Sequence, residues 1–237
     1  MIQTISADEV KRRAAALGAD LCGIAPVDRF VDAPAGFHPT AVLGGCRSVI
    51  VIAQQFPASV FASPSAAAYT FAMFKAADQV DTAAFRIASE LDRLGSRAIA
   101  VPSREPYEYW DEGRRHGQGI LSLKHAAVRA GLGRMGKNTL LVNDKFGNLL
   151  CLGAVLVDRE LAADRPAEYL TCEPDCRICL DACPAKALDG ASIEQRKCRS
   201  VCGRYSEGGG FIYACNLCRR SCPHHRGLKT LLEREKA

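Results

Sequence analysis

The chain has 237 residues, which suffices for one large domain or for a medium domain with a small module. Lys and Arg outnumber Asp and Glu by 31 to 26, and apolar residues make up 48%, an ordinary share for a globular protein. The apolar runs at residues 48–53 and 149–157 are too short to span a membrane, and the N-terminus lacks the basic and apolar regions of a secretory signal. We therefore expect a cytoplasmic protein that does not enter a membrane.

The first quarter of the chain predicts one helix and two strands. Residues 6–17 begin with the S-x-x-E form of a capping box, which predicts a helix. Residues 21–25 predict a short buried strand, and residues 28–46, rich in Pro and Gly, predict a loop. Residues 48–53 (SVIVIA) are apolar without alternation, so we expect a strand covered on both faces.

The middle of the chain continues to alternate between helix and strand. Apolar residues recur at helical spacing over residues 64–94, and a strand is predicted at residues 98–101. A further helix is predicted at residues 120–130. Residues 140–142 and 149–157 predict two strands joined as a hairpin. This order indicates a mixed α/β layer protein.

Nine of the twelve cysteines lie between residues 172 and 222. In a reducing compartment, dense cysteines are more often metal ligands than disulfides. Two of the runs end in Cys-Pro, as in ferredoxins, where each run supplies three ligands to one [4Fe–4S] cluster and a fourth to the other. The pattern therefore predicts two [4Fe–4S] clusters. Zinc bound by paired C-x2-C units is the alternative.

The ferredoxin rule of exchanged ligands assigns the cysteines to the two clusters. The first run has three residues between its first two cysteines where two are usual, so a bulge, a three-iron cluster or an altered first ligand is expected there. In the second set, Cys198 and Cys202 compete for one place. The first cluster takes Cys172, Cys176, Cys179 and the remote Cys222, and the second takes Cys215, Cys218, the remote Cys183, and Cys198 or Cys202.

The positive charge is concentrated beside these cysteines. After Cys183, Lys and Arg outnumber Asp and Glu by 11 to 5, whereas before it the balance is 20 to 21. Each cluster with its four thiolates carries about −2, so two clusters would bring the net charge of +5 to roughly +1. We interpret the basic tail as a local counter-charge and do not expect nucleic acid as a partner.

A polar segment, residues 164–168 (DRPAE), precedes the first run of cysteines. We place a domain boundary there, between an α/β core at residues 1–165 and a double [4Fe–4S] domain at residues 166–237.

Several motifs in a fixed order resemble a known family. Residues 130–141 (AGLGRMGKNTLL) and 152–158 (LGAVLVD) precede the first Cys-Pro run, and residues 196–198 (RKC) and 212–223 (IYACNLCRRSCP) follow it. This order resembles the epoxyqueuosine reductases and, more distantly, the corrinoid-dependent reductive dehalogenases. The resemblance favours Cys198 over Cys202, because Arg-Lys-Cys198 matches the family's corresponding motif.

The resemblance implies a nitroreductase-like mixed-sheet core followed by a bacterial-ferredoxin-like module. It also implies that the core seats a cobalamin, with flavin as a weaker option because such cores also bind flavins. The family's glycine-rich segment near the corrinoid maps here onto Gly131, Gly133, Gly136, Lys137 and Asn138. A helix C-cap followed by a glycine-rich turn is the alternative interpretation of the same residues.

The sequence departs from the family where a proton donor is expected. The family's Val-Asp-Ser step becomes residues 101–103 (VPS), and the chain as given has no counterpart of the C-terminal helical domain that supports transfer-RNA binding. Directly after the position of the family's aspartate, residues 104–112 (REPYEYWDE) form a run rich in aromatic and acidic side chains. A solvated loop is the alternative to a catalytic role for this run. The candidate proton donors in it are Tyr107, Glu108 and Tyr109.

These features together predict an iron–sulfur oxidoreductase. Electrons from an external low-potential donor would pass through two clusters to a cofactor or small-molecule substrate in the core, rather than to epoxyqueuosine in transfer RNA. The alternative is a carrier without turnover of its own, which reductively activates a corrinoid protein or another partner.

Overall fold

The fold is built on a four-stranded antiparallel sheet. A computed structural model describes residues 5–228. The strand order is β1 (Leu21–Pro26), β2 (Ser48–Gln55), β8 (Leu150–Val157) and β3 (Ala98–Val101). β2 pairs with β8 along its whole length, from Ser48 opposite Val157 to Gln55 opposite Leu150. The two long apolar strands therefore occupy the centre of the sheet, where both edges of each are paired.

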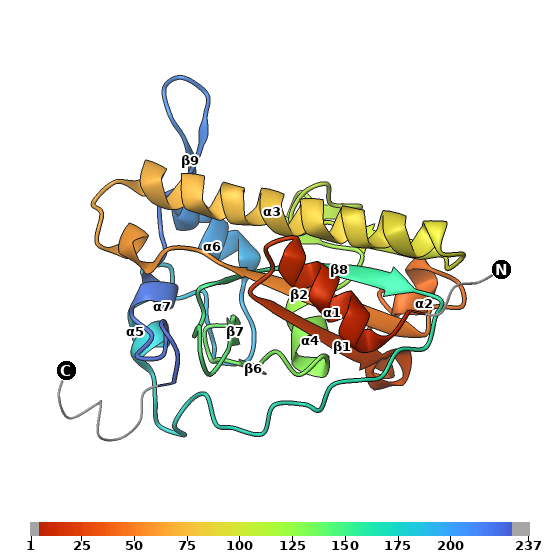
Figure 1. Ribbon diagram of the computed structural model, residues 1–237. Helices are drawn as coiled ribbons and strands as arrows, with labels where there is room; N and C mark the ends of the chain where they lie inside the picture. The colour runs from red at the N-terminus through yellow and green to blue at the C-terminus, as the bar shows by residue number, and fades with distance from the viewer. Residues whose placement is uncertain (1–4, 229–237) are drawn as a thin grey trace.

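Helices cover both faces of this sheet, as expected for residues 48–53. Ile50 and Ile52 pack with α1 (Ala7–Ala16) and α3 (Ala66–Arg93), whereas Val49 and Val51 pack with α4 (Leu123–Arg129). Figure 1 shows α1 and α3 on one side and α4 on the other. All four side chains are fully buried. Each such burial stabilises the fold by about 1.5–3 kcal/mol.

Local sequence accounts for the helix ends. Ser6 Oγ accepts a hydrogen bond from the Glu9 N–H at 3.1 Å, so the predicted N-cap of α1 is present. The Glu9 carboxylate, however, pairs with Arg12 and Arg13. Its contacts with these two guanidinium groups keep the pKa of Glu9 below its usual value. Gly95, with φ of +85°, follows the last turn of α3 in the left-handed region that favours glycine.

The expected hairpin between residues 140–142 and 149–157 is wrong. β7 (Leu141–Val142) pairs with β6 (Arg134–Met135) instead, while β2 and β3 flank β8 on its two edges. The chain does reverse at the expected place, because Asn143 and Gly147 form an antiparallel bridge. The turn is thus local, but the strand that follows it has distant partners.

Several short elements lie in segments expected to be loops. The segment at residues 28–46 contains most of η1 (Val27–Phe30) and all of α2 (Pro39–Val42), and η2 (Ala58–Phe61) precedes α3. Besides the β6–β7 pair, two small ribbons lie outside the main sheet in the described residues. One joins β4 (Tyr109–Asp111) to β5 (His116–Gln118), and the other joins β9 (Gly203–Tyr205) to β10 (Phe211–Tyr213).

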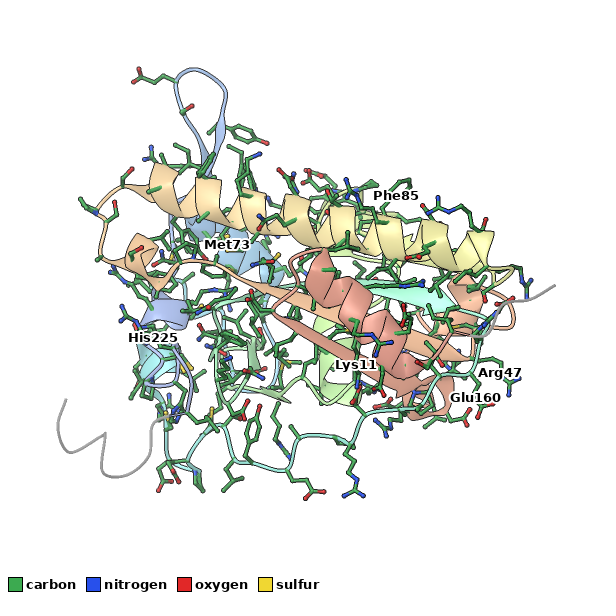
Figure 2. The ribbon with its side chains drawn as sticks, viewed as in Figure 1. Lys11, Arg47, Met73, Phe85, Glu160 and His225 are labelled. Atoms are coloured by element: carbon green, nitrogen blue, oxygen red, sulfur yellow. The ribbon has the colours of Figure 1, made fainter. Side chains whose placement is uncertain are left out.

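The cysteine-rich part of the chain lies at one end of the molecule. Its helices are α5 (Ile178–Asp181), α6 (Gln195–Cys202) and α7 (Leu217–Arg220), and α5 and α7 pack against each other. Figure 1 shows this pair beside one end of α3, with the β9–β10 ribbon extending past the helix. In Figure 2, His225 lies at this end, and the ion pair of Arg47 with Glu160 (2.6 Å) lies at the opposite end.

No helix within residues 5–228 combines the length and the apolar character needed to cross a membrane.

Candidate metal centres

Four cysteines from the two Cys-Pro runs line one cavity. Cys172, Cys176 and Cys179 come from the first run and Cys222 from the second, and the cavity measures about 290 Å³. The set is the one that the ferredoxin rule assigns to the first cluster. Burial, and after it the neighbouring thiols of Cys222, Cys172 and Cys176, raise the pKa of Cys179 to about 11. Four thiolates in such a place need a cation to neutralise them, so the donor set fits an iron–sulfur cluster.

Lys137 binds the backbone of the segment between Cys172 and Cys176, where the spacing is one residue longer than usual. Its ammonium group donates to the backbone carbonyls of Glu173 (3.2 Å), Pro174 and Cys176 (3.0 Å), which lie in that segment. The Cys176 N–H donates to the Glu173 carbonyl at 3.1 Å, so the extra residue is taken up in a turn. The bulge expected from the sequence is therefore a turn fastened by one lysine.

Backbone N–H groups point at three of the candidate ligand sulfurs. The Lys137 N–H donates to Cys172 Sγ at 3.5 Å, and the Ala187 N–H donates to Cys183 Sγ at 3.3 Å. The His224 N–H donates to the thiol of Cys222, although burial is the larger effect and raises the pKa of Cys222 to about 11. Such hydrogen bonds favour thiolate over thiol and tune the potential of a bound cluster.

A second group of cysteines, none of which lines this cavity, lies around Cys218. Burial raises the pKa of Cys218, and the thiols of Cys215 and Cys183 raise it further. Cys198 lies near the same group, since Cys218 and Cys183 both act on its thiol. These four are the ligands expected for the second cluster. Their metal-binding role stays a prediction.

Cys198 and Cys202 lie one turn apart on α6, and their thiols hydrogen-bond to each other. That bond, with Cys198 as donor, raises the pKa of Cys198 and lowers that of Cys202. Nearby Arg199 and Arg115 lower the pKa of Cys202 further. The thiols of Cys218 and Cys183 act on Cys198, whereas Arg199 and Arg115 act on Cys202. The choice of Cys198 over Cys202 stays a prediction that rests on the motif Arg-Lys-Cys198.

The two Cys-Pro runs fold alike. In the first run the N–H groups of Leu180 and Asp181 donate to the Arg177 carbonyl, and the Cys183 N–H donates to the Leu180 carbonyl. In the second run the N–H groups of Arg219 and Arg220 donate to the Asn216 carbonyl, and the Cys222 N–H donates to the Arg219 carbonyl. The same three backbone hydrogen bonds therefore recur in both runs, and each run holds its last cysteine, Cys183 or Cys222, in the same way.

The glycine-rich segment supports this cysteine-rich part from the core side. Asn138 is buried, and its Nδ2 donates to the Cys218 carbonyl at 3.0 Å. Asn148 is also buried, and its Nδ2 donates to the Arg219 carbonyl at 3.1 Å. With Lys137, these side chains connect the core to both runs of cysteines. None of these contacts was foreseen from sequence.

The glycines of this segment are packed against the chain itself. A Cβ on Gly131 would lie 2.2 Å from the Arg165 carbonyl oxygen, and one on Gly133 would lie 2.5 Å from that of Val142. A Cβ on Gly136 would lie 2.9 Å from Asn138 Oδ1. Close packing within the protein therefore explains the glycines, as in the alternative interpretation of a cap and turn. Because these contacts do not require a ligand, cobalamin binding at this segment stays a prediction that rests on the resemblance.

The candidate proton donors lie on the β4–β5 ribbon and the segment before it. Glu108 and Tyr109 are exposed and line a cavity of about 530 Å³ with Trp110, Asp111, Arg114, His116 and Gln118. Tyr107 is half-buried and stacks on Trp110. Arg199 of α6 covers both rings, at 5.7 and 5.0 Å from their centroids. The ribbon therefore lies against the helix that carries Cys198, and a catalytic role for the three residues stays a prediction.

Within residues 5–228, no three His, Cys, Asp or Glu side chains converge closely enough to bind a single metal ion. The ligands of a cubic cluster differ in this respect, because each binds a different iron.

Comparison with known proteins supports the resemblance, although no family model matches the chain. The chain is 37% identical over 123 residues to the epoxyqueuosine reductase of Staphylococcus aureus, which covers 47% of this chain and 32% of the relative. It is 27% identical over 203 residues to that of Bacillus anthracis, covering 81% of this chain and 51% of the relative. The chain thus spans about a third to a half of these relatives. The chain is similar to the epoxyqueuosine reductases, as its motifs predicted.

Solved structures show the same fold. Epoxyqueuosine reductase from Streptococcus thermophilus superposes with a TM-score of 0.63 at 21% identity, over 94% of this chain and 66% of that one. A catabolic reductive dehalogenase in complex with 3-bromo-4-hydroxybenzoic acid superposes with a TM-score of 0.67 at 19% identity. The superposition covers 99% of this chain and 34% of that one. The mixed α/β fold with antiparallel sheets is therefore shared with both groups.

One further structure bears on the expected partners. It contains an epoxyqueuosine reductase with an epoxyqueuosine-modified tRNA stem loop and superposes with a TM-score of 0.61 at 20% identity, over 94% of this chain and 66% of that one. A relative in fold that binds RNA weighs against the expectation that nucleic acid is not a partner.

Proposed function

We propose that this chain is an iron–sulfur oxidoreductase that passes electrons through two [4Fe–4S] clusters to an acceptor bound at its α/β core. The observation that carries the proposal is the cavity of about 290 Å³ shared by Cys172, Cys176, Cys179 and Cys222. Cysteines far apart in sequence converge there, as the exchange of ligands between two ferredoxin-like runs requires. The likeness to epoxyqueuosine reductases points to the same chemistry.

Two sets of four cysteines would each bind one cluster, and other residues hold the segments that carry these cysteines. Cys172, Cys176, Cys179 and Cys222 would bind one cluster, and Cys183, Cys198, Cys215 and Cys218 the other. When bound, each cluster supplies one-electron transfer. Lys137 fixes the segment between the first two ligands, and Asn138 holds the backbone at Cys218. The N–H groups of Lys137, Ala187 and His224 stabilise negative charge on three sulfurs.

The acceptor is a cofactor or a small molecule rather than epoxyqueuosine in transfer RNA. Supporting this, Pro102 stands where the family has its aspartate, and the neighbouring Ser103 is engaged by Asp81, which accepts from its N–H at 2.8 Å and its hydroxyl at 2.9 Å. Glu108 and Tyr109 line a cavity large enough for a small molecule and present the acidic groups from which a proton can be donated. Cobalamin, and less directly flavin, are the cofactors that the resemblance implies.

Anaerobic reconstitution with iron, sulfide and cobalamin tests the proposal. The repurified protein should contain about eight irons and eight sulfides per chain. Cys222→Ser should lower the iron content by about half, because it removes a ligand of the first cluster. Cys46→Ser is the matched control, since Cys46 is buried in the core beside the sheet. Equal iron in both variants would refute the assignment of Cys222, and absence of cobalt would remove cobalamin from the proposal.

A carrier without turnover is the second candidate. Two observations favour it. Other residues of the chain fill the space beside Gly131, Gly133 and Gly136, and Glu108 and Tyr109 are exposed. Such a carrier would reductively activate a corrinoid protein or another partner. Clusters that exchange electrons with a partner while no small molecule is consumed would support it, and turnover with retained cobalt or flavin would exclude it.

A further inference from the structure

A concave basic surface lies beside the second group of cysteines. A cavity of about 590 Å³ is lined by Lys186, Ala187 and the start of α6, among other residues. The Ala187 N–H contacts Cys183 Sγ, and α6 carries Cys198. The lining therefore includes segments that carry or contact proposed ligands of the second cluster.

The charge of this surface is positive and only partly compensated. Its cations are Arg114, Lys186, Arg196 and Lys197, and its acids are Asp189 and Glu194. The Asp189 carboxylate is already engaged by the N–H groups of Ala191 and Ser192 and by the Ser192 hydroxyl. Glu194 pairs with Lys197 at 2.6 Å, but both side chains are about half exposed, and such pairs contribute little binding energy.

The remaining cations have weak partners. Arg196 and Lys186 donate to the backbone carbonyls of Gly113 and Asp181, each at 3.2 Å. Arg114 is 84% exposed, and its nearest carboxylate, on Asp111, is 3.7 Å away. We define these four cations, Arg114, Lys186, Arg196 and Lys197, as the basic surface.

The surface over the first group of cysteines is less basic. The segment from Cys172 to Asp181 carries Glu173, Asp175 and Asp181, and the cations there are Arg177, which pairs with Asp181, and Lys137. An acidic partner is therefore attracted more strongly at the basic surface, because complementary potentials steer encounter.

We propose that the basic surface is the docking site of a small acidic one-electron carrier protein of the ferredoxin type. This proposal rests on the proposed function, because the second cluster is what the carrier would reduce. In that step the carrier would lose one electron and a cluster held by Cys183, Cys198, Cys215 and Cys218 would gain it, with no bond formed or broken. Encounters between redox proteins use small, charge-steered interfaces, and a concave patch of four cations is suited to one.

Charge reversal tests the proposal. Arg196→Glu/Lys197→Glu lies in the first turn of α6, where acidic side chains favour the helix, so the variant should fold. Arg86→Glu/Arg93→Glu on α3 is the matched control, because it changes the net charge equally at the groove between α1 and α3. Stopped-flow absorbance would follow reduction of the reconstituted clusters by a reduced plant-type [2Fe–2S] ferredoxin at low ionic strength.

The α6 variant should react with ferredoxin at least about tenfold more slowly than the wild type and the α3 variant, and added salt should reduce the difference. Calorimetry should show the same loss of affinity for oxidised ferredoxin. Reduction by the methyl viologen radical cation should not slow in either variant, since that donor is positively charged. Failure of viologen to reduce any protein would instead refute the proposed function, so the two failures are distinguishable.

Equal rates with ferredoxin for all proteins would overturn the proposal. Equal slowing with ferredoxin and viologen would also overturn it, because it would indicate damage to the cluster. A last experiment measures the affinity of the wild type and the α6 variant for a tRNA stem-loop RNA by titration. If the α6 variant loses affinity for RNA while ferredoxin reduces it at the wild-type rate, the basic surface belongs to RNA.

Discussion

Lys137 contacts Cys172 and its loop in two ways, with its backbone N–H 3.5 Å from Cys172 Sγ and its ammonium on the carbonyls that follow this cysteine. The lysine belongs to the glycine-rich segment that the resemblance places near a corrinoid. Its ammonium group donates to three backbone carbonyls of the protein itself. Its position makes the first cavity depend on a residue outside the cysteine-rich part.

Lys137→Met should weaken binding of the first cluster while leaving the second in place. Hydrogen bonds to a charged group contribute about 1.5–3 kcal/mol, and this substitution removes three of them while keeping the length of the side chain. Iron content under a chelator should fall toward about four per chain, faster than in the wild type. Lys145→Met is the control, since Lys145 is exposed on the turn that follows the glycine-rich segment. Parallel loss of iron in both variants would contradict the role given to Lys137.

Cys198→Ser and Cys202→Ser should differ sharply in iron content. Cys198 is the proposed ligand and lies near Cys183 and Cys218, so its loss should remove about four irons. Cys202→Ser should keep about eight irons, because Cys202 is not among the proposed ligands and lies near Arg199 and Arg115. Iron analysis with electron paramagnetic resonance of the reduced proteins checks this. The reverse result would make Cys202 the ligand.

Gly147→Ala should destabilise the protein far more than Gly209→Ala. Both glycines have positive φ, +60° and +80°. A residue with a Cβ is less stable in this left-handed conformation by a free energy of about 1–2 kcal/mol. At Gly147 the new Cβ would also lie 2.1 Å from the His224 carbonyl oxygen, whereas at Gly209 it meets open space. Urea unfolding should give a midpoint clearly lower for Gly147→Ala. Equal midpoints would show that the contact between residues 147 and 224 is not maintained.

Cys22 and Cys151 should resist alkylation in the folded protein. Burial raises the pKa of Cys22 to about 12 and that of Cys151 to about 11, so at pH 8 only about one in 10,000 and one in 1,000 molecules hold the reactive thiolate. Because both pKa values are raised on folding, their contribution to stability is complete below the unfolded value near 8.5 and is lost as the pH rises toward 11–12. Iodoacetamide labelling with peptide mapping checks this against a urea-unfolded sample. Rapid labelling of the folded chain at pH 8 would contradict it.

The long elements of the core were predictable because their own residues carry the signal. α3 follows the helical spacing of Val80, Ala84, Ile87 and Leu91, all buried, and β2 follows its uninterrupted apolar run. The pairing of β8 was not predictable, since the turn at Asn143–Gly147 indicated a local partner and the actual partners lie far away in sequence. The β9–β10 ribbon was missed because its strands are three residues long and lack a buried face.

The cysteine groups were predictable from spacing, whereas the residues that support them were not. Cys222 could be paired with Cys172 only through the ferredoxin rule, and both line one cavity. The bond from Asn148 to the Arg219 carbonyl joins residues 71 positions apart, and no pattern of spacing indicates it. The extra residue before Cys176 was the one local signal that some side chain must fasten this loop.

The convergence of Cys172 and Cys222 on one cavity also sets an order for the making of the protein. A ribosome that has just added Cys179 has delivered three of the four side chains, and the fourth is encoded more than forty codons later. Until that residue is added, the growing chain holds an incomplete set of ligands for this site. The complete set exists only once residue 222 has been synthesised.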